Sequence, residues 1–107
     1  MLPFVQTVRY QVEELQQGRH AAYLDAARQW WPGVEGVLRF HVLRARTGDR
    51  RFTEVITFES RERWQTLQQD ETFEEQSEAL LGQLGAAVDM ASVEIALHDE
   101  LVFVEEA

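Results

Sequence analysis

Two side chains that could move a proton and hold an anion lie two positions apart in a segment with the alternating pattern of a β-strand. They are Arg39 and His41, within residues 36–46. Alternate residues of a strand face the same side of a sheet. Histidine exchanges a proton near neutral pH, and arginine orients an enolate, phenolate or carboxylate through charge-assisted hydrogen bonds. Arg39 and His41 are therefore candidate catalytic residues, and a surface or interface pair is the alternative interpretation.

Four further polar residues share that side of the predicted sheet. Arg9, Thr57, Glu94 and His98 are candidate ligand-binding residues. If the first and last strands pair, Arg9 lies beside Glu94, because residues directly opposite on neighbouring strands interact. An Arg9–Glu94 ion pair is the simplest account of these two side chains.

The composition excludes several kinds of chemistry. The histidines, His20, His41 and His98, are widely spaced and none belongs to an HxH or HExxH motif, so no metal site is predicted. The chain has no cysteine, which excludes disulfides, thiolate nucleophiles and sulfur-ligated metals. All ten basic residues are arginine, so a Schiff-base lysine and a P-loop lysine are excluded as well.

The charge and hydropathy of the chain bear on its partners. A net charge of -9 disfavours phosphate backbones and anionic membrane surfaces, so neither nucleic acid nor a membrane is an expected partner. No basic segment followed by a long apolar stretch opens the sequence, and no run of eighteen apolar residues follows. A cytoplasmic location is the default expectation.

The elements that must position these residues follow from hydrophobic periodicity and turn chemistry. Strands are predicted over 4–12, 36–46, 51–59 and 92–97, a helix over 18–31, and a second helix from a Ser60 cap that breaks near Asp70. Thr72 and Glu75 have capping-box spacing for its second part. Residues from about 99 to 107 form a C-terminal arm or a short extra strand. The 107 residues therefore predict one α+β domain, a ferredoxin-like βαββαβ fold with an antiparallel sheet and two helices on one face.

The alternation along the strands divides their residues between two faces. The helix-facing set is Val8, Tyr10, Leu38, Phe40, Val42, Ile56, Phe58, Val93, Ile95 and Leu97. The opposite set is Thr7, Arg9, Gln11, Arg39, His41, Leu43, Thr53, Val55, Thr57, Glu94, Ala96 and His98. The second set is amphiphilic, which favours a lined cavity between two sheets over plain solvent exposure. A homodimer with such a cavity is therefore expected.

The tryptophans, Trp30, Trp31 and Trp64, lie at helical spacing with other apolar residues and beside helix ends. Aromatic residues in such positions are typical of a core, so we expect packing roles rather than a ligand-stacking platform.

Three sequence segments resemble a known superfamily. Residues 31–36 (WPGVEG) lead into the second strand, and residues 55–64 (VITFESRERW) run from the third strand into a polar cap and helix, followed by 70–73 (DETF). In these features the chain resembles the dimeric α/β barrel proteins, nearest to the antibiotic-biosynthesis-monooxygenase-like group. The resemblance implies two sheets packed face to face in a homodimer.

The resemblance also implies a choice of functions. One is a cofactor-independent monooxygenase-like protein that binds a small aromatic or enolisable molecule, with His41 removing a proton and Arg39 steadying the anion. The alternative is a non-catalytic small-ligand-binding or assembly domain of the same fold. The haem-degrading branch places a tryptophan and an axial histidine where this chain has Phe58 and Ser77, which argues against haem, although His41 or His98 leaves a displaced ligand open.

Overall fold

The structure is a computed structural model that describes residues 1–105, so the last two residues of the predicted arm, 106 and 107, lie outside the described residues. Its elements follow the predicted order of strand, helix, hairpin, helix and strand. They are β1 (Phe4–Gln11), α1 (Gln17–Trp30), β2 (Val37–Arg44), β3 (Arg51–Phe58), α2 (Arg61–Gln68), α3 (Glu71–Gly85) and β4 (Glu94–Asp99). The predicted break in the second helix is confirmed, because α2 and α3 are separate helices on either side of Asp70.

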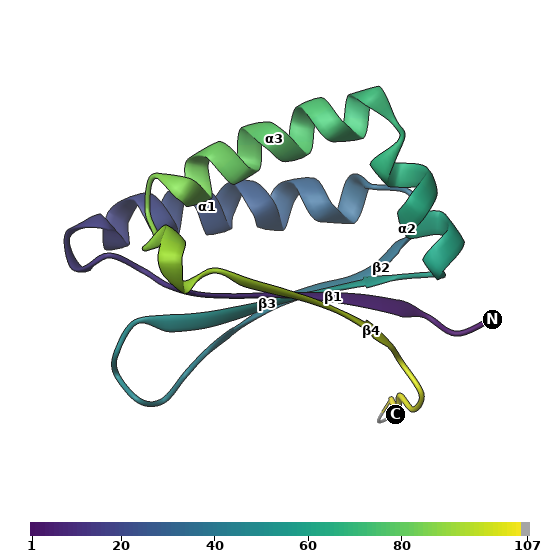
Figure 1. The fold of residues 1–107 in the computed structure, drawn as a ribbon, viewed down its shortest axis with the longest axis horizontal. Coiled ribbons are helices and arrows are strands. Elements are labelled where there is room, and N and C mark those ends of the chain that lie inside the picture. The colour runs from purple at the N-terminus through teal and green to yellow at the C-terminus, as the bar shows by residue number, and fades with distance from the viewer. Residues whose placement is uncertain (106–107) are drawn as a thin grey trace.

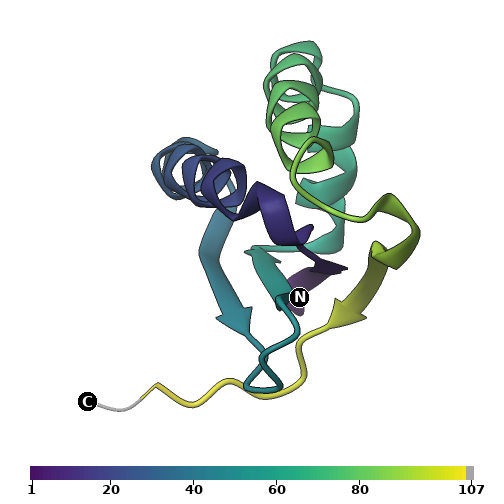
Figure 2. The same ribbon diagram turned by 90° about the vertical axis from the view of Figure 1, so that its left-hand side faces the viewer.

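The four strands form one antiparallel sheet in the order β2-β3-β1-β4. All three helices lie on the same side of this sheet (Figure 1 and Figure 2). The side without helices is called the open face below. This architecture is the predicted ferredoxin-like α+β fold with helices on one face.

The hydrophobic core fills the space between the sheet and the helices. Central strands β1 and β3 contribute Phe4, Val8, Tyr10, Ile56 and Phe58, and the helices contribute Tyr23, Ala27, Leu67, Leu80 and Leu84. The two central strands supply the most deeply buried large side chains because both of their edges are paired and a helical layer covers them.

Strand register confirms the predicted faces of β1 and β3 and corrects one assignment on β2. Val8 pairs with Glu54 and Gln6 with Ile56, so these residues all face the helices. Leu38 was predicted to face the helices too, but a β-bulge between Val37 and Arg39 interrupts the alternation there. Leu38 is consequently half exposed rather than part of the core.

Strand β4 departs from the prediction in its exposure. Ile95 and Leu97 have the expected parity, opposite Val8 and Gln6, yet both remain exposed. The reason is position, since β4 is an edge strand that lies beyond the layer of helices (Figure 2). The same periodic pattern therefore produces burial on a central strand and exposure on an edge strand.

Helices α2 and α3 each have a short polar side chain at the N-cap position. The Ser60 side chain accepts a hydrogen bond from the Arg63 N–H, as predicted. The cap of α3 is Asp70, whose side chain accepts from the Phe73 N–H at 2.9 Å, and the predicted capping box at Thr72 is wrong. A carboxylate at the N-cap accepts hydrogen bonds from the free N–H groups of the first turn, and its negative charge interacts favourably with the helix dipole.

The residues after β4 form an extended arm and no additional strand as far as residue 105. The arm leaves β4 at one edge of the sheet and crosses the open face toward β2 at the other edge (Figure 2). Arg39 of β2 anchors it: its Nη2 donates to both carboxylate oxygens of Glu100 at 2.7 and 2.8 Å, and its Cζ lies 3.8 Å from the centroid of the Phe103 ring.

The turn before β2 provides a test of backbone strain. Gly36 has a φ of 92°, and a Cβ added there would lie 2.4 Å from the side chain of Arg63. Gly36→Ala should therefore lower the free energy of unfolding by about 1 to 3 kcal/mol in urea denaturation. Gly82 in α3 has open space around it, so Gly82→Ala should instead raise stability by up to about 1 kcal/mol. Equal stability of the two variants would contradict this account.

Candidate functional site

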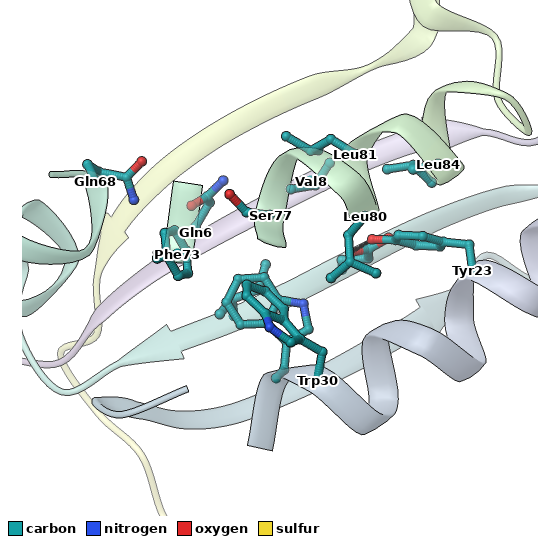
Figure 3. A pocket seen from close by; sticks show the side chains of 13 residues that line it. Gln6, Val8, Tyr23, Trp30, Gln68, Phe73, Ser77, Leu80, Leu81 and Leu84 are labelled. Carbon is teal, nitrogen blue, oxygen red and sulfur yellow. Dashed lines mark hydrogen bonds between the residues drawn. The ribbon is translucent and has the colours of Figure 1, made fainter. Parts of the chain in front are cut away.

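A cavity of about 120 Å³ lies between the sheet and the helices α1 and α3 (Figure 3). Three aromatic residues form one wall: Trp30 at the end of α1, Trp31 directly after it, and Phe73 near the start of α3. The ring centroids of Trp30 and Trp31 are 4.7 Å apart, and those of Trp30 and Phe73 are 5.5 Å apart. Leu80 and Leu84 of α3 add aliphatic surface. Such walls favour a flat, apolar occupant.

The cavity has a polar group at each end. Figure 3 shows Gln6 and Ser77 toward one end and Tyr23 toward the other. Gln6 Oε1 accepts a hydrogen bond from Trp64 Nε1 at 3.2 Å, which leaves the donors of its amide NH₂ without a partner among residues 1–105. Glu54 hydrogen-bonds with Tyr23 and belongs to the opposite end. The two ends therefore offer a hydrogen-bond donor and a carboxyl group.

Glu54 is buried on the helix-facing side of β3, with 2% of its surface exposed. The Tyr10 hydroxyl donates to its Oε2 at 2.6 Å and the Tyr23 hydroxyl donates to its Oε1 at 2.8 Å. In the described part of the chain no arginine or histidine forms an ion pair with it. Glu54 is thus a buried carboxyl group that two phenol hydroxyls hold in place and no positive charge neutralises.

This environment shifts the protonation of all three groups. Burial raises the pKa of Glu54, and the hydrogen bonds from Tyr10 and Tyr23 reduce that rise without cancelling it. Burial and the neighbouring Glu54 both raise the pKa of Tyr10 and of Tyr23. The tyrosines therefore stay protonated as donors, while Glu54 exchanges its proton closer to neutral pH. A carboxyl group with these properties suits general acid–base chemistry.

His20 extends the polar cluster on the side of Glu54 away from the cavity. It is buried on α1, and its Nε2 lies 2.9 Å from the Tyr10 hydroxyl oxygen. Its ring packs 4.4 Å from the Phe52 ring, centroid to centroid. Burial lowers the pKa of His20, so the imidazole is neutral near neutral pH.

Arg39 and His41, the predicted catalytic pair, do face one side of the sheet, but that side is the open face. The Arg39 guanidinium is occupied by Glu100 and Phe103 of the arm. His41 is exposed and pairs across the sheet with Val55. Neither residue lines the cavity, because a residue of the open face points away from the helices.

The four predicted ligand-binding residues also lie on the open face. Arg9 is opposite Glu94 in the β1–β4 register, but the expected ion pair between them is absent from the described structure. This corrects the prediction: both residues are exposed, so water can solvate each charge separately. His98 Nε2 lies 3.2 Å from the Thr7 hydroxyl. Thr57 is buried, with 1% of its surface exposed. The structure therefore spreads these residues across the sheet rather than gathering them around one cavity.

The residue that the sequence analysis missed is Glu54. The predicted helix-facing set contained Ile56 and Phe58 but did not extend back along the strand to Glu54 and Phe52, which have the same parity. A glutamate at an inward position of an otherwise apolar face was the available signal, because carboxylates are rarely buried without a partner. This cavity lies on the helix-covered side of the sheet, whereas the cavity expected between two sheets of a homodimer stays a prediction.

All three tryptophans have packing roles, and two of them, Trp30 and Trp31, also form part of the cavity wall. All three pack against the core as predicted, with the Trp64 ring 5.3 Å from Phe4, centroid to centroid. Trp30 Nε1 donates to Gln76 at 2.8 Å. Trp31 Nε1 is the one buried side-chain polar atom among the described residues that lacks a hydrogen-bond partner.

Within residues 1–105 no group of three or more histidine, aspartate or glutamate side chains is arranged to hold a metal ion. No helix in that range is long and apolar enough to cross a membrane.

Comparison with solved structures identifies the fold, whereas no family model and no curated protein matches the chain. SnoaB, a cofactor-independent oxygenase from Streptomyces nogalater, has a TM-score of 0.76 at 13% identity over 99% of this chain and 100% of that one. A proposed antibiotic biosynthesis monooxygenase from Bordetella bronchiseptica has a TM-score of 0.73 at 12% identity, over 95% and 100%. A conserved protein from Methanosarcina mazei Go1 has a TM-score of 0.74 at 14% identity, over 92% of both chains.

The chain therefore has the fold of SnoaB and of the proposed antibiotic biosynthesis monooxygenase, as the sequence resemblance predicted. At these identities the likeness establishes the fold alone, since one fold hosts many activities. Any activity must be argued from the cavity of this chain.

The buried carboxyl group makes a prediction about stability. Because the pKa of Glu54 is raised in the folded state, that state holds the proton more tightly than the unfolded chain does. The free energy of unfolding should fall as pH rises from the ordinary carboxyl range through the raised pKa, by up to about 1.4 kcal/mol per pH unit. In Glu54→Gln this component of the pH dependence should be missing. Urea denaturation at a series of pH values measures it.

The matched control is Glu59→Gln, one residue beyond β3, where the carboxylate is exposed. That variant should keep the wild-type pH dependence, because the Glu59 carboxylate is hydrated in both states. If the curves of wild type and Glu54→Gln ran parallel at every pH, the assignment of the shifted group to Glu54 would be wrong.

Proposed function

We propose that this protein is a cofactor-independent monooxygenase-like protein that binds a small phenol in the cavity between helices and sheet and uses Glu54 as the proton acceptor. The observation that carries the proposal is Glu54 itself, a buried carboxyl group in the wall of an aromatic-lined cavity, hydrogen-bonded by Tyr10 and Tyr23. A general base has to reach its substrate and needs a pKa closer to neutral pH than an ordinary carboxyl group has; Glu54 lines the cavity, and burial raises its pKa in that direction.

The size of the cavity supports a ligand with one aromatic ring. Its volume is about 120 Å³. An apolar cavity of about 150 Å³ binds benzene, whereas sites for drug-sized molecules span about 300 to 1,000 Å³. A ring between Trp30 and Leu80 would contact apolar surface on both faces.

The charge of the cavity supports a neutral hydroxyl compound. Glu54 is the one carboxyl group among its lining residues, and no cationic side chain is among them. A carboxylate ligand would meet like charge, while a phenol can donate its hydroxyl proton to Glu54. The Gln6 amide at the other end would donate to an oxygen on the far side of the ring.

The reaction that fits this arrangement is the conversion of a phenol to a para-quinone by molecular oxygen. Glu54 takes the phenolic proton, the phenolate transfers an electron to O₂, and the resulting radicals combine at the para carbon. The peroxide then loses water. Overall, phenol and O₂ give quinone and H₂O, with one oxygen atom in each product. The phenol supplies all four electrons, so neither an external reductant nor a redox cofactor enters the balance.

Phenol and 2,6-dimethylphenol test the proposal directly. Both should quench tryptophan fluorescence, because Trp30 and Trp31 line the cavity. With ¹⁸O₂, mass spectrometry should find one labelled oxygen in the quinone. Glu54→Gln should reduce oxygen consumption by about 100-fold or more, the usual contribution of a general base, with a smaller effect on binding. Glu59→Gln is the matched control and should keep the wild-type rate.

Other outcomes separate the alternatives. Fluorescence quenching without oxygen consumption would favour the non-catalytic ligand-binding domain. Loss of activity in His41→Ala together with normal activity in Glu54→Gln would move the chemistry to the open face. Neither quenching nor oxygen uptake with these phenols would contradict the proposed function.

A homodimer formed through the open face is also part of the proposal. The four apolar residues 101–104 of the arm are each more than half exposed, and Leu43 on the same side of β2 is half exposed as well. Isolated chains seldom expose so much contiguous apolar surface, and edge strands favour pairing with another chain. A second copy of this chain is the partner that the fold favours.

Light scattering tests the dimer and the role of the arm. Wild-type protein should have twice the mass of the chain, and Phe103→Asp should shift it toward the monomer, since a charge in a packed apolar interface is strongly unfavourable. Leu15→Asp is the control, because Leu15 is exposed just before α1 on the helical side. A monomeric wild type, or a Phe103→Asp variant that remains dimeric, would contradict this prediction.

A further inference from the structure

A chain of hydrogen bonds leads from Glu54 away from the cavity. Glu54 Oε2 is 2.6 Å from the Tyr10 hydroxyl oxygen, and that oxygen is 2.9 Å from His20 Nε2. Tyr10 and His20 do not line the cavity, whereas Glu54 does. The three groups therefore form a continuous path that starts at the cavity wall and ends at the imidazole of α1.

The far end of this path reaches solvent. Nδ1 of His20 makes no hydrogen bond to any described residue. Among residues 1–105, Trp31 Nε1 is the one fully buried side-chain polar atom that lacks a hydrogen-bond partner. His20 Nδ1, which also lacks a partner, is therefore not fully buried. The residue keeps 4% of its surface exposed. His20 Nδ1 is consequently in contact with water while Nε2 faces Tyr10.

We propose that Tyr10 and His20 form a proton relay that connects Glu54, inside the cavity, with solvent at His20 Nδ1. The relay rests on the proposed function, because it exchanges protons for Glu54, the proton acceptor of that function. A ligand that fills the cavity covers the cavity side of Glu54, so a route on the other side lets the carboxyl group exchange its proton with the ligand still bound.

The transfer is balanced without any change in covalent bonds between heavy atoms. The proton on Glu54 Oε2 moves to the Tyr10 oxygen as the Tyr10 hydroxyl proton moves to His20 Nε2. The resulting imidazolium releases its Nδ1 proton to water. One proton has left Glu54 for solvent, Tyr10 is again a neutral phenol, and His20 is a neutral imidazole with its proton on Nε2. The hydrogen bonds then all point toward the Glu54 carboxylate, as the base requires.

The groups that face Glu54 carry no charge, whereas at the His20 end of the relay Arg44 of β2 pairs with Phe52, the residue against which the imidazole packs. Tyr10 of β1 and Tyr23 of α1 face the carboxyl oxygens, α3 presents Ser77, Leu80 and Leu84 across the cavity, and Val42 pairs with Glu54 from β2. None of these side chains carries a charge near neutral pH. Burial lowers the pKa of His20, which keeps a lone pair available to accept a proton.

Tyr23 provides the matched control for the relay. Its hydroxyl donates to the other oxygen of the same carboxyl group and, within residues 1–105, leads to no further hydrogen-bond partner. Tyr10→Phe and Tyr23→Phe therefore each remove one hydrogen bond from Glu54, but only Tyr10→Phe interrupts the path to His20. His20→Phe interrupts the path one step later and keeps an aromatic ring beside Phe52.

The experiment is NMR of protein with ¹³C-labelled glutamate carboxyl groups, with the Glu54 signal assigned by its loss in Glu54→Gln. Line shapes at the midpoint of the titration of each variant give the rate of proton exchange with solvent. Exchange in Tyr10→Phe and in His20→Phe should be slower than in Tyr23→Phe by about tenfold or more, since a positioned proton carrier contributes at least that much. Thermal denaturation of each variant establishes that it is folded. If His20→Phe does not fold, the comparison of Tyr10→Phe with Tyr23→Phe is sufficient to test the relay.

Equal exchange rates in Tyr10→Phe and Tyr23→Phe would overturn the relay, and so would a wild-type Glu54 that does not exchange its proton. Failure of the proposed function is recognised separately. If the phenols neither bind nor react, the exchange rates still report on the relay. If Glu54→Gln abolishes oxidation while Tyr10→Phe and Tyr23→Phe exchange alike, Glu54 is the base and the relay is absent.

Discussion

The burial of one carboxyl group constrains much of the interior of this protein. A carboxylate inside a core is unfavourable by several kcal/mol unless hydrogen bonds replace the water it has lost. Here the compensating hydroxyls come from Tyr10 on β1 and Tyr23 on α1, so the hydrogen bonds of Glu54 join both central strands to the first helix. Because no cation among residues 1–105 pairs with it, burial raises the pKa of Glu54 and the group holds a proton more tightly. The same arrangement that keeps the fold stable therefore produces a group able to exchange protons inside a cavity.

The sheet separates two environments that have different uses. Its helix-covered face holds the core, the cavity and Glu54, and its open face carries arginines, histidines and the crossing arm. Alternation along β3 illustrates the separation, since Glu54 and Ile56 face the helices while Val55 and Thr57 face the other way. The chemistry and the association proposed above would thus occupy opposite faces of the same strands.

The structural neighbours share the fold at 11–17% identity, so the scaffold tolerates nearly complete replacement of its side chains. What a strand-and-helix framework requires is a pattern of apolar positions, which many sequences supply. The polar groups inside the cavity are a separate matter, because each of them depends on a partner at a defined distance. In this chain those partners are two tyrosines and a histidine around one glutamate, and that set defines what this version of the fold can do.

The sequence by itself determined the order of the elements, the break at Asp70 and the faces of the central strands, because hydrophobic period, turn residues and caps act over a few residues of chain. It also contained the signal for Glu54, a charged residue at an inward position. Local patterns did not reveal that Tyr10 and Tyr23 converge on Glu54 across up to 44 positions of sequence, that His20 hydrogen-bonds with Tyr10, or that Glu100 and Phe103 contact the Arg39 guanidinium. Only the tertiary structure decided those contacts, because they depend on register, on the bulge beside Leu38 and on how the helices pack. None of these can be inferred from the chemistry of neighbouring residues alone.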